Sequence, residues 1–299
     1  MSVAFPDTTI LQLQGPQAYL LADPTGVRLG EHFSRVLDWY SRGGFTDEFG
    51  RYHHSGHNIS FGYLEVLNEI DINPHFAYGG PLNATRRYIK LFDGVATAVK
   101  QRHPSIKFVG NCLSGRGDGD GGIVWRTFLN RSEHAAGVPW PIDAVSYHLY
   151  TGRASDGAPF NEWPAGLVQN ARNVLPSAKT VTSLIKQLSP TTQVFVDEIG
   201  LFFTEPVREA MDFETMRGDG LNTSFWNLQS AIYSMWAGEL AAVGVDMFGA
   251  SQLLGYPAGP PGTPVGAPAG NPAAGTPFQP QVTPDGNCPV CINPCSVSP

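Results

Sequence analysis

The chain has 299 residues, of which 42% are hydrophobic and 15% charged, and its formal net charge at pH 7 is −7. That apolar share suits a globular core and excludes a wholly disordered chain. A weakly acidic chain without a basic stripe is a poor candidate for binding nucleic acid or an anionic membrane, whereas a neutral partner such as a sugar fits this balance.

No stretch of about 18 consecutive apolar residues occurs, so we expect no membrane-spanning segment. The first seven residues lack the basic and apolar regions of a signal peptide. Four glycosylation sequons begin at Asn58, Asn83, Asn130 and Asn222. Because such tripeptides also arise by chance, they leave both an extracellular full-length parent and a non-secreted one open.

Three zones follow one another along the chain. Residues 1–30 show weak periodicity, residues 31–256 alternate between helical and strand patterns, and residues 257–299 are dominated by Pro, Gly, Ala and Thr. The sequence therefore predicts an irregular N-terminal remnant, one folded domain, and a disordered tail that buries little apolar area.

The middle zone predicts helices and strands in alternation. Apolar residues at helical spacing predict helices near 31–41, 85–102, 124–135, 164–188 and 224–243. Short apolar and β-branched runs predict strands near 63–67, 106–110, 142–150, 193–198 and 245–250, with one further strand near 9–14. Strands separated by helices imply parallel pairing and an α/β architecture, either an open doubly wound sheet or a barrel.

Two stretches that could bind ions or phosphate carry weak signals. Residues 115–122 are rich in glycine but fit neither the dinucleotide fingerprint nor the P-loop, so we interpret them as a flexible loop, with a calcium site as the less favoured alternative. Cys288, Cys291 and Cys295 are spaced C-x2-C-x3-C, yet a closed zinc site needs four ligands and no fourth Cys or His lies nearby. Cys112, at the end of a strand-like run, is expected to be a small buried hydrophobic residue. We therefore expect no metal and no cofactor.

Three predicted strands end in polar residues. Asn68 and Glu69 follow the strand near 63–67, His148 and Tyr150 end the strand near 142–150, and Glu198 ends the strand near 193–198. In an α/β barrel the carboxyl ends of the strands form the floor of the active site, so these side chains are expected to converge.

Paired carboxylates at such a floor suit glycoside hydrolysis. One must protonate the departing glycosidic oxygen, and the other must attack the anomeric carbon or activate water. Asn68 can donate a hydrogen bond to a sugar hydroxyl, and Tyr150 or His148 can donate to Glu198 and keep it ionised. Taken singly, a strand-end Glu is usually just solvated and His148 could be a satisfied core residue; the joint pattern is much harder to obtain by chance.

The two strands that carry carboxylates resemble motifs of clan A glycoside hydrolases. The segment Tyr63–Glu69 (YLEVLNE) resembles their fourth-strand Asn-Glu motif, and Val194–Gly200 (VFVDEIG) resembles their seventh-strand nucleophile motif. The nearest resemblance is to the xylosidase-like enzymes of family 39, over about residues 31–256.

This resemblance implies a (β/α)8 TIM-barrel fold and a retaining O-glycosidase that works without metal on a carbohydrate or glycoside. It implies Glu69 as the acid/base and Glu198 as the nucleophile. The residues expected to surround the substrate are Asn68, His148, Tyr150 and Gln252.

The sequence departs from the family pattern in three places. Only one strand, near 9–14, can be argued before residue 63, where a complete barrel needs about three. The tryptophan often found at the end of the eighth strand is absent from residues 245–254, where Phe248 or Gln252 stands in, and the final helix is replaced by the tail. We therefore expect an incomplete barrel without its N-terminal strands.

The sequence leaves one alternative function open and argues against another. One is a catalytically inactive, truncated barrel that at most binds carbohydrate. The other is an α/β enzyme of unrelated chemistry such as an aldolase, which would need a lysine at the strand ends; the lysines of the middle zone fall on predicted helices or at a strand start.

Overall fold

The computed structural model of the chain describes residues 10–13, 23–72, 79–151, 163–201 and 223–250. Within these ranges six parallel strands form one sheet in the order β1-β4-β5-β6-β7-β8. The strands are β1 (Ile10–Leu13), β4 (Tyr63–Val66), β5 (Lys107–Leu113), β6 (Ala144–Thr151), β7 (Gln193–Leu201) and β8 (Met247–Ala250). A separate antiparallel hairpin joins β2 (Gly44–Thr46) to β3 (Tyr52–His54).

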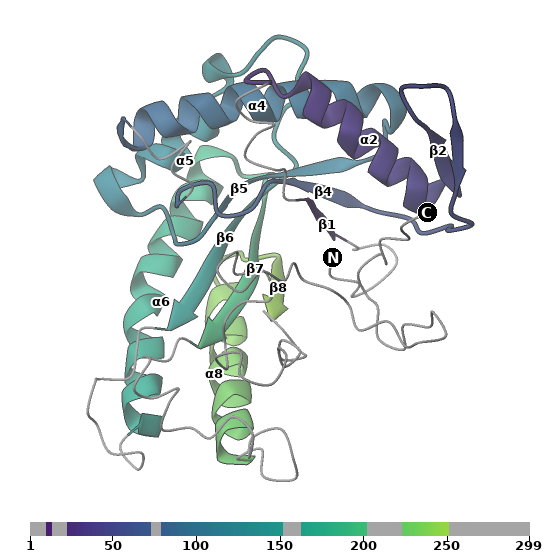
Figure 1. Cartoon of the computed structure of the whole chain (residues 1–299). Helices are drawn as coiled ribbons and strands as arrows, with labels where there is room; N and C mark the ends of the chain where they lie inside the picture. Colours follow the sequence, from purple (N-terminus) through teal and green to yellow (C-terminus); the bar gives the residue numbers. More distant parts are fainter. Residues whose placement is uncertain (1–9, 14–22, 73–78, 152–162, 202–222, 251–299) are drawn as a thin grey trace.

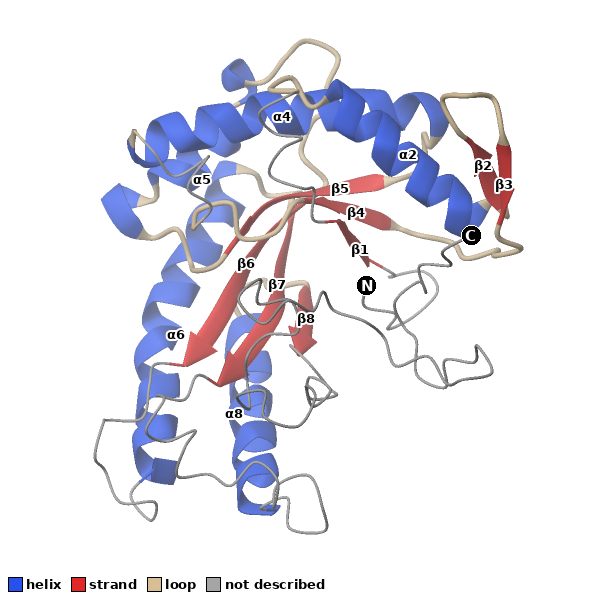
Figure 2. Cartoon of the chain, viewed as in Figure 1, coloured by secondary structure: helices blue, strands red, loops and turns tan. Residues whose placement is uncertain are grey.

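The helices lie outside a strongly curved sheet. They are α2 (Val27–Ser41), α4 (Gly80–Arg102), α5 (Ile123–Phe128), α6 (Trp163–Leu188) and α8 (Thr223–Ala241), with 3-10 turns at Gly119–Gly121 and Arg131–Glu133. Figure 1 shows α2 and α4 beside β4 and β5, while α6 and α8 run along β6 and β7. Figure 2 shows the strands fanning around this curve as part of a barrel wall would. Within the described residues, no helix combines the length and apolar character needed to cross a membrane.

Helix α2 shows how sequence periodicity becomes packing. Leu29, Phe33 and Leu37 recur at a spacing of four residues and are almost fully buried, with exposed fractions of 1%, 1% and 0%. This apolar face packs on α4, where Gly94 permits close approach of the turn that leads into α2: a Cβ atom at Gly94 would lie 1.8 Å from the carbonyl oxygen of Thr25.

The strand predictions are confirmed, whereas some helix limits were wrong. Strand β1 pairs in parallel with β4, as the run near 9–14 predicted. Helix α2 begins at Val27 and crosses residue 30, where the sequence placed a domain boundary, because Asp23 accepts hydrogen bonds from its first free N–H groups, those of Arg28 and Leu29. Helix α5 ends at Phe128, well before the expected position near 135, because the side chain of Asn130 caps a separate 3-10 turn.

The described sheet forms part of a barrel. In the ranges above, β1 and β8 are its two edges and do not pair with each other. The tail, residues 257–299, lies outside the described residues. That the barrel lacks its N-terminal strands remains a prediction.

Candidate active site

Polar side chains lie together at the carboxyl-terminal end of the sheet, as the sequence predicted. Glu69 follows β4, His148 and Tyr150 lie on β6, and Glu198 lies on β7 directly opposite His148 in the strand register. Because all the strands are parallel, their carboxyl ends lie at the same end of the sheet.

One buried histidine contacts both carboxylates. His148 has no exposed side-chain surface, and its Nδ1 lies 2.9 Å from Oε1 of Glu69 and 3.3 Å from Oε2 of Glu198. The hydroxyl of Tyr150 donates a 2.8 Å hydrogen bond to the same Oε2 of Glu198. The Glu69 and Glu198 side chains are 30% and 25% exposed, so a ligand can reach both.

The two carboxylates are also close to each other. One oxygen of Glu69 and one of Glu198 lie within 4.8 Å, together with a ring nitrogen of His148. Burial alone would lower the pKa of His148, but the hydrogen bond to Glu69 and the charges of Asp197 and Glu198 outweigh it and raise that pKa. The ring of His148 therefore stays protonated to a higher pH than an ordinary histidine does.

An extra residue in β7 allows both Asp197 and Glu198 to reach His148. Consecutive side chains of a regular strand face opposite sides. Between Phe195 and Glu198, however, β7 gains one residue relative to its partner on β6, which advances only from Ser146 to His148. Such a bulge re-aims side chains and is common beside active sites.

A second bulge lies in β5, where the pairing with β6 shifts between Gly110 and Leu113. The two residues between them, Asn111 and Cys112, have left-handed φ angles of 72° and 36°. Leu67 and Glu69, just after β4, are left-handed as well, with φ of 67° and 49°, and the backbone N–H of Glu69 donates to the carbonyl oxygen of Cys112 at 2.8 Å. Left-handed backbone costs a non-glycine residue about 1–2 kcal/mol. Strain of this kind gathers at functional sites.

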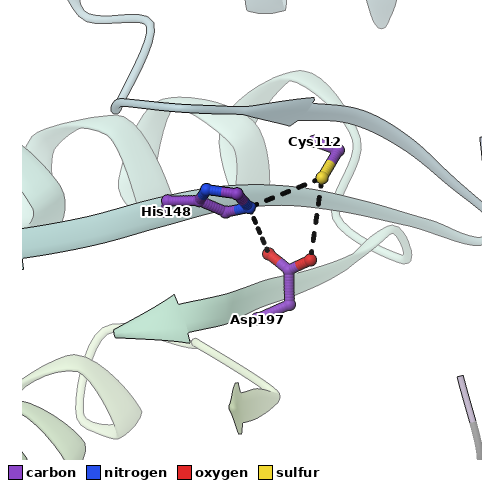
Figure 3. A group of neighbouring side chains, drawn as sticks. All are labelled: Cys112, His148 and Asp197. Carbon is purple, nitrogen blue, oxygen red and sulfur yellow. Dashed lines mark hydrogen bonds and ion pairs between the residues drawn. The ribbon is translucent and has the colours of Figure 1, made fainter. Parts of the chain in front are cut away.

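Beneath the exposed carboxylates lies a buried polar layer. Figure 3 shows Cys112, His148 and Asp197 pointing toward one another from three neighbouring strands. Sγ of Cys112 lies 3.5 Å from Nε2 of His148 and 3.8 Å from Oδ2 of Asp197. Glu65, only 1% exposed, hydrogen-bonds to Asp197, Cys112 and Ser146.

Burial is the main cause of the shifted pKa values in this buried polar layer. It raises the pKa of Asp197 well above the ordinary value, and it raises the pKa of Glu65 too. The pKa of the Cys112 thiol is likewise raised well above its usual range, first by burial and then by the charges of Glu65 and Asp197. Cys112 is buried as expected, but the expectation of an apolar role was wrong, because its sulfur faces polar atoms rather than a hydrophobic cluster.

Two expected substrate contacts have different outcomes. The side-chain oxygen of Asn68 accepts a 3.0 Å hydrogen bond from the Cys112 thiol, so this part of the amide is turned toward the buried layer. Gln252 lies outside the described residues. Sequence reasoning missed Glu65, Cys112 and Asp197 as members of the site; the available signal was three polar residues inside or at the end of strands that are otherwise apolar.

No family model matches the sequence, and no curated protein matches it. Among solved structures, the chain is similar to a Paenibacillus polymyxa xyloglucanase from glycoside hydrolase family 44, with a TM-score of 0.48 and 12% identity over 76% of this chain and 47% of that one. It is similar to a glucosidase from Croceicoccus marinus, with a TM-score of 0.46 and 16% identity over 75% of this chain and 37% of that one. A family 51 α-L-arabinofuranosidase from Bifidobacterium longum gives a TM-score of 0.45 and 15% identity over 66% of this chain and 40% of that one. The chain thus spans less than half the length of each of these three glycoside hydrolases, and the two families named here are 44 and 51 rather than 39.

Proposed function

We propose that the chain hydrolyses O-glycosidic bonds with retention of configuration, with Glu198 as nucleophile and Glu69 as acid/base. The observation that carries this proposal is the pair of partly exposed carboxylates with oxygens within 4.8 Å of each other, both in contact with His148. Carboxyl groups about 5–5.5 Å apart are typical of retention, whereas inversion needs about 6.5–9.5 Å to admit a water molecule.

The hydrogen bonds favour this division of roles. Oε2 of Glu198 accepts a 2.8 Å hydrogen bond from the Tyr150 hydroxyl, and it lies 3.3 Å from Nδ1 of His148, whose hydrogen bond is to Oε1 of Glu69. Donors to a carboxylate favour its ionised form, which a nucleophile requires. Only the His148 contact is found for the carboxylate of Glu69 among the described residues. The acid/base role is therefore proposed for Glu69, as the resemblance of its strand motif implies.

In the proposed reaction Glu198 attacks the anomeric carbon while Glu69 gives its proton to the departing glycosidic oxygen. The bond from sugar to leaving group breaks, and a glycosyl ester of Glu198 forms. Glu69, now ionised, takes a proton from water as that water attacks the anomeric carbon, which releases the sugar and restores both carboxyl groups. The proposed substrate is a neutral glycoside, with Asn68 and Gln252 as further contacts.

A nitrophenyl glycoside screen of the 299-residue chain tests this function. In Glu198→Ala, turnover should be abolished and added azide should yield a product of inverted configuration. In Glu69→Ala, azide should rescue substrates with good leaving groups and yield a retained product. Glu133→Ala is a matched control, because Glu133 pairs with Arg86 on the surface.

Two outcomes would overturn the assignment. One is near wild-type activity in both variants on every glycoside that the parent chain cleaves. The other is sugar binding without hydrolysis of any glycoside, which would establish the inactive carbohydrate-binding barrel instead.

A further inference from the structure

We infer that Cys112, His148 and Asp197 bind a zinc ion on the buried side of the site, with Glu65 as the fourth ligand. No local spacing motif predicts this site, because its donors come from four different strands, β4, β5, β6 and β7. The ion would lie on the Nε2 side of His148, away from the two carboxylates proposed for catalysis.

The donor atoms have the separations that one zinc ion requires. The three contacts are 3.5 Å from Cys112 Sγ to His148 Nε2, 3.8 Å from that sulfur to Asp197 Oδ2, and 3.9 Å from Nε2 to Asp197 Oδ1. Zinc bonds to sulfur, nitrogen and oxygen are about 2.0–2.3 Å long, which places neighbouring ligand atoms of a tetrahedral site about 3.3–3.8 Å apart, close to the separations found here. All three donors also lie within 4.8 Å of one another.

Glu65 is not among the side chains whose donor atoms all lie within 4.8 Å of one another, so to fill the fourth position of a closed, tetrahedral zinc site its carboxyl group would have to move toward the ion. The carboxyl group of Glu65 hydrogen-bonds to both Asp197 and Cys112, so it already adjoins two of the other ligands. Ser146 donates a hydrogen bond to Oε1 of Glu65 and orients this carboxyl group from outside the cluster. Such outer hydrogen bonds are typical of metal ligands.

The layer also has a polar atom that needs a partner. The Asp197 side chain is 8% exposed, yet in the part of the chain that the structure describes its Oδ1 has no hydrogen-bond partner. In the same residues no Lys or Arg forms an ion pair with Glu65 or Asp197, so two buried carboxyl groups and a thiol share one histidine as their possible positive charge. Unpaired polar groups of this kind are costly to bury. A divalent cation would satisfy Oδ1 and balance the acids.

The mixed donor set selects the type of ion. Thiolate and imidazole ligands favour zinc, whereas magnesium and calcium prefer all-oxygen sites. Zinc on Nε2 would also leave the ring proton on Nδ1, where it can donate to Glu69 or Glu198. The ion would therefore hold His148 in the tautomer that the proposed active site needs, without touching the substrate.

The test is metal binding without any substrate, so its result is independent of the proposed glycosidase activity. We would use the full chain with Cys288, Cys291 and Cys295 changed to Ser, which leaves Cys112 as its one thiol. After incubation with zinc and desalting, elemental analysis should find about one zinc per chain. Cobalt should give a near-ultraviolet sulfur-to-cobalt charge-transfer band.

Adding Cys112→Ser to this background should abolish the charge-transfer band and weaken zinc binding by more than about 100-fold, since even outer-shell changes cost 10- to 100-fold. Asp197→Asn should weaken zinc binding while keeping the cobalt–sulfur band, with circular dichroism checking that each variant is folded. The proposal is overturned if the tail-thiol-free chain binds no stoichiometric zinc or cobalt, or if Cys112→Ser binds zinc equally well. Either result would mean that hydrogen bonds, without a metal ion, join the buried polar side chains.

Discussion

Two tyrosines on β6 show how position decides what a side chain does. Tyr150 reaches Glu198 at the site, whereas Tyr147 is fully buried on the other side of the strand, where its hydroxyl lies 3.1 Å from that of Thr182 on α6. Burial raises the pKa of Tyr147 to about 12. The same residue type therefore supplies a candidate catalytic contact at one position and core packing at the other.

Tyr150→Phe should reduce kcat by about 10- to 100-fold, because hydrogen bonds to charged groups contribute about 1.5–3 kcal/mol. The variant removes the donor to Oε2 of Glu198 and leaves the ring in place. Tyr147→Phe is the matched control and should lower the free energy of unfolding with little effect on kcat. Steady-state kinetics and urea denaturation of both variants separate the two effects; equal kcat values for Tyr150→Phe and the parent would contradict the proposed role.

Asp23→Ala should lower the free energy of unfolding by about 1 kcal/mol at pH 7, as the loss of a helix cap does. The Asp23 carboxylate accepts from the backbone N–H groups of Arg28 and Leu29 and from the hydroxyl of Thr25. Burial raises its pKa, but these hydrogen bonds outweigh burial and hold the pKa below the ordinary value. Its stabilising contribution is therefore present above the unfolded-state pKa of about 3.9 and is lost as the pH falls through the folded-state pKa.

Urea denaturation of the parent and of Asp23→Ala over a series of pH values measures this difference. It should shrink steadily below about pH 4. A difference that grows on acidification would show that the folded-state pKa is raised instead.

At the level of single residues, the sequence predicted which polar side chains lie close together, but it did not predict which atoms of these side chains contact one another. Glu69, Glu198, His148 and Tyr150 were expected at one edge because polar residues at the ends of parallel strands converge there. That one ring nitrogen of His148 faces both carboxylates depends on side-chain directions that strand periodicity does not encode.

At the level of elements, the helix pair α2–α4 depends on glycine. Gly94→Ala should lower the free energy of unfolding by about 1–3 kcal/mol, the usual cost of forcing an atom into a packed interior. The added Cβ would meet the backbone carbonyl oxygen of Thr25 at 1.8 Å, and backbone cannot rotate away as a side chain can.

Gly238→Ala in α8 is the control, because nothing lies within 4 Å of the added Cβ. It should stabilise the chain by about 0.5–1 kcal/mol, since alanine is the better helix former. Thermal denaturation compares the two variants. A Gly94→Ala protein as stable as the parent would show that the turn before α2 can move away from α4 without loss of stability.

The bulges mark the limit of sequence-based prediction for the elements. The order and parallel direction of the strands followed from alternating helix and strand patterns. The extra residue in β5 and the one in β7 leave no such pattern, because a bulge changes the facing of the residues that follow it without changing their types. Cys112 and Asp197 sit at these two bulges, so they were not identified as site residues.

At the scale of the whole molecule, the site joins distant parts of the chain. Glu65, Cys112, His148 and Asp197 come from four neighbouring strands of one curved sheet, β4 to β7. A ligand shared by all four strands would bind only the folded state, because the unfolded chain keeps these residues far apart. Binding of this kind adds directly to the free energy of unfolding.

Zinc should therefore raise the melting temperature of the chain that lacks the three tail thiols. A ligand at 100 times its Kd adds about 2.7 kcal/mol of stability. Each kcal/mol moves the melting temperature of a domain of this size by about 2–4 °C, so zinc should raise it by about 5–10 °C and a chelator should reverse the shift. The Cys112→Ser form of the same chain should show almost no shift, because its site has lost the sulfur ligand. A shift of equal size in both forms would place the bound zinc elsewhere on the molecule.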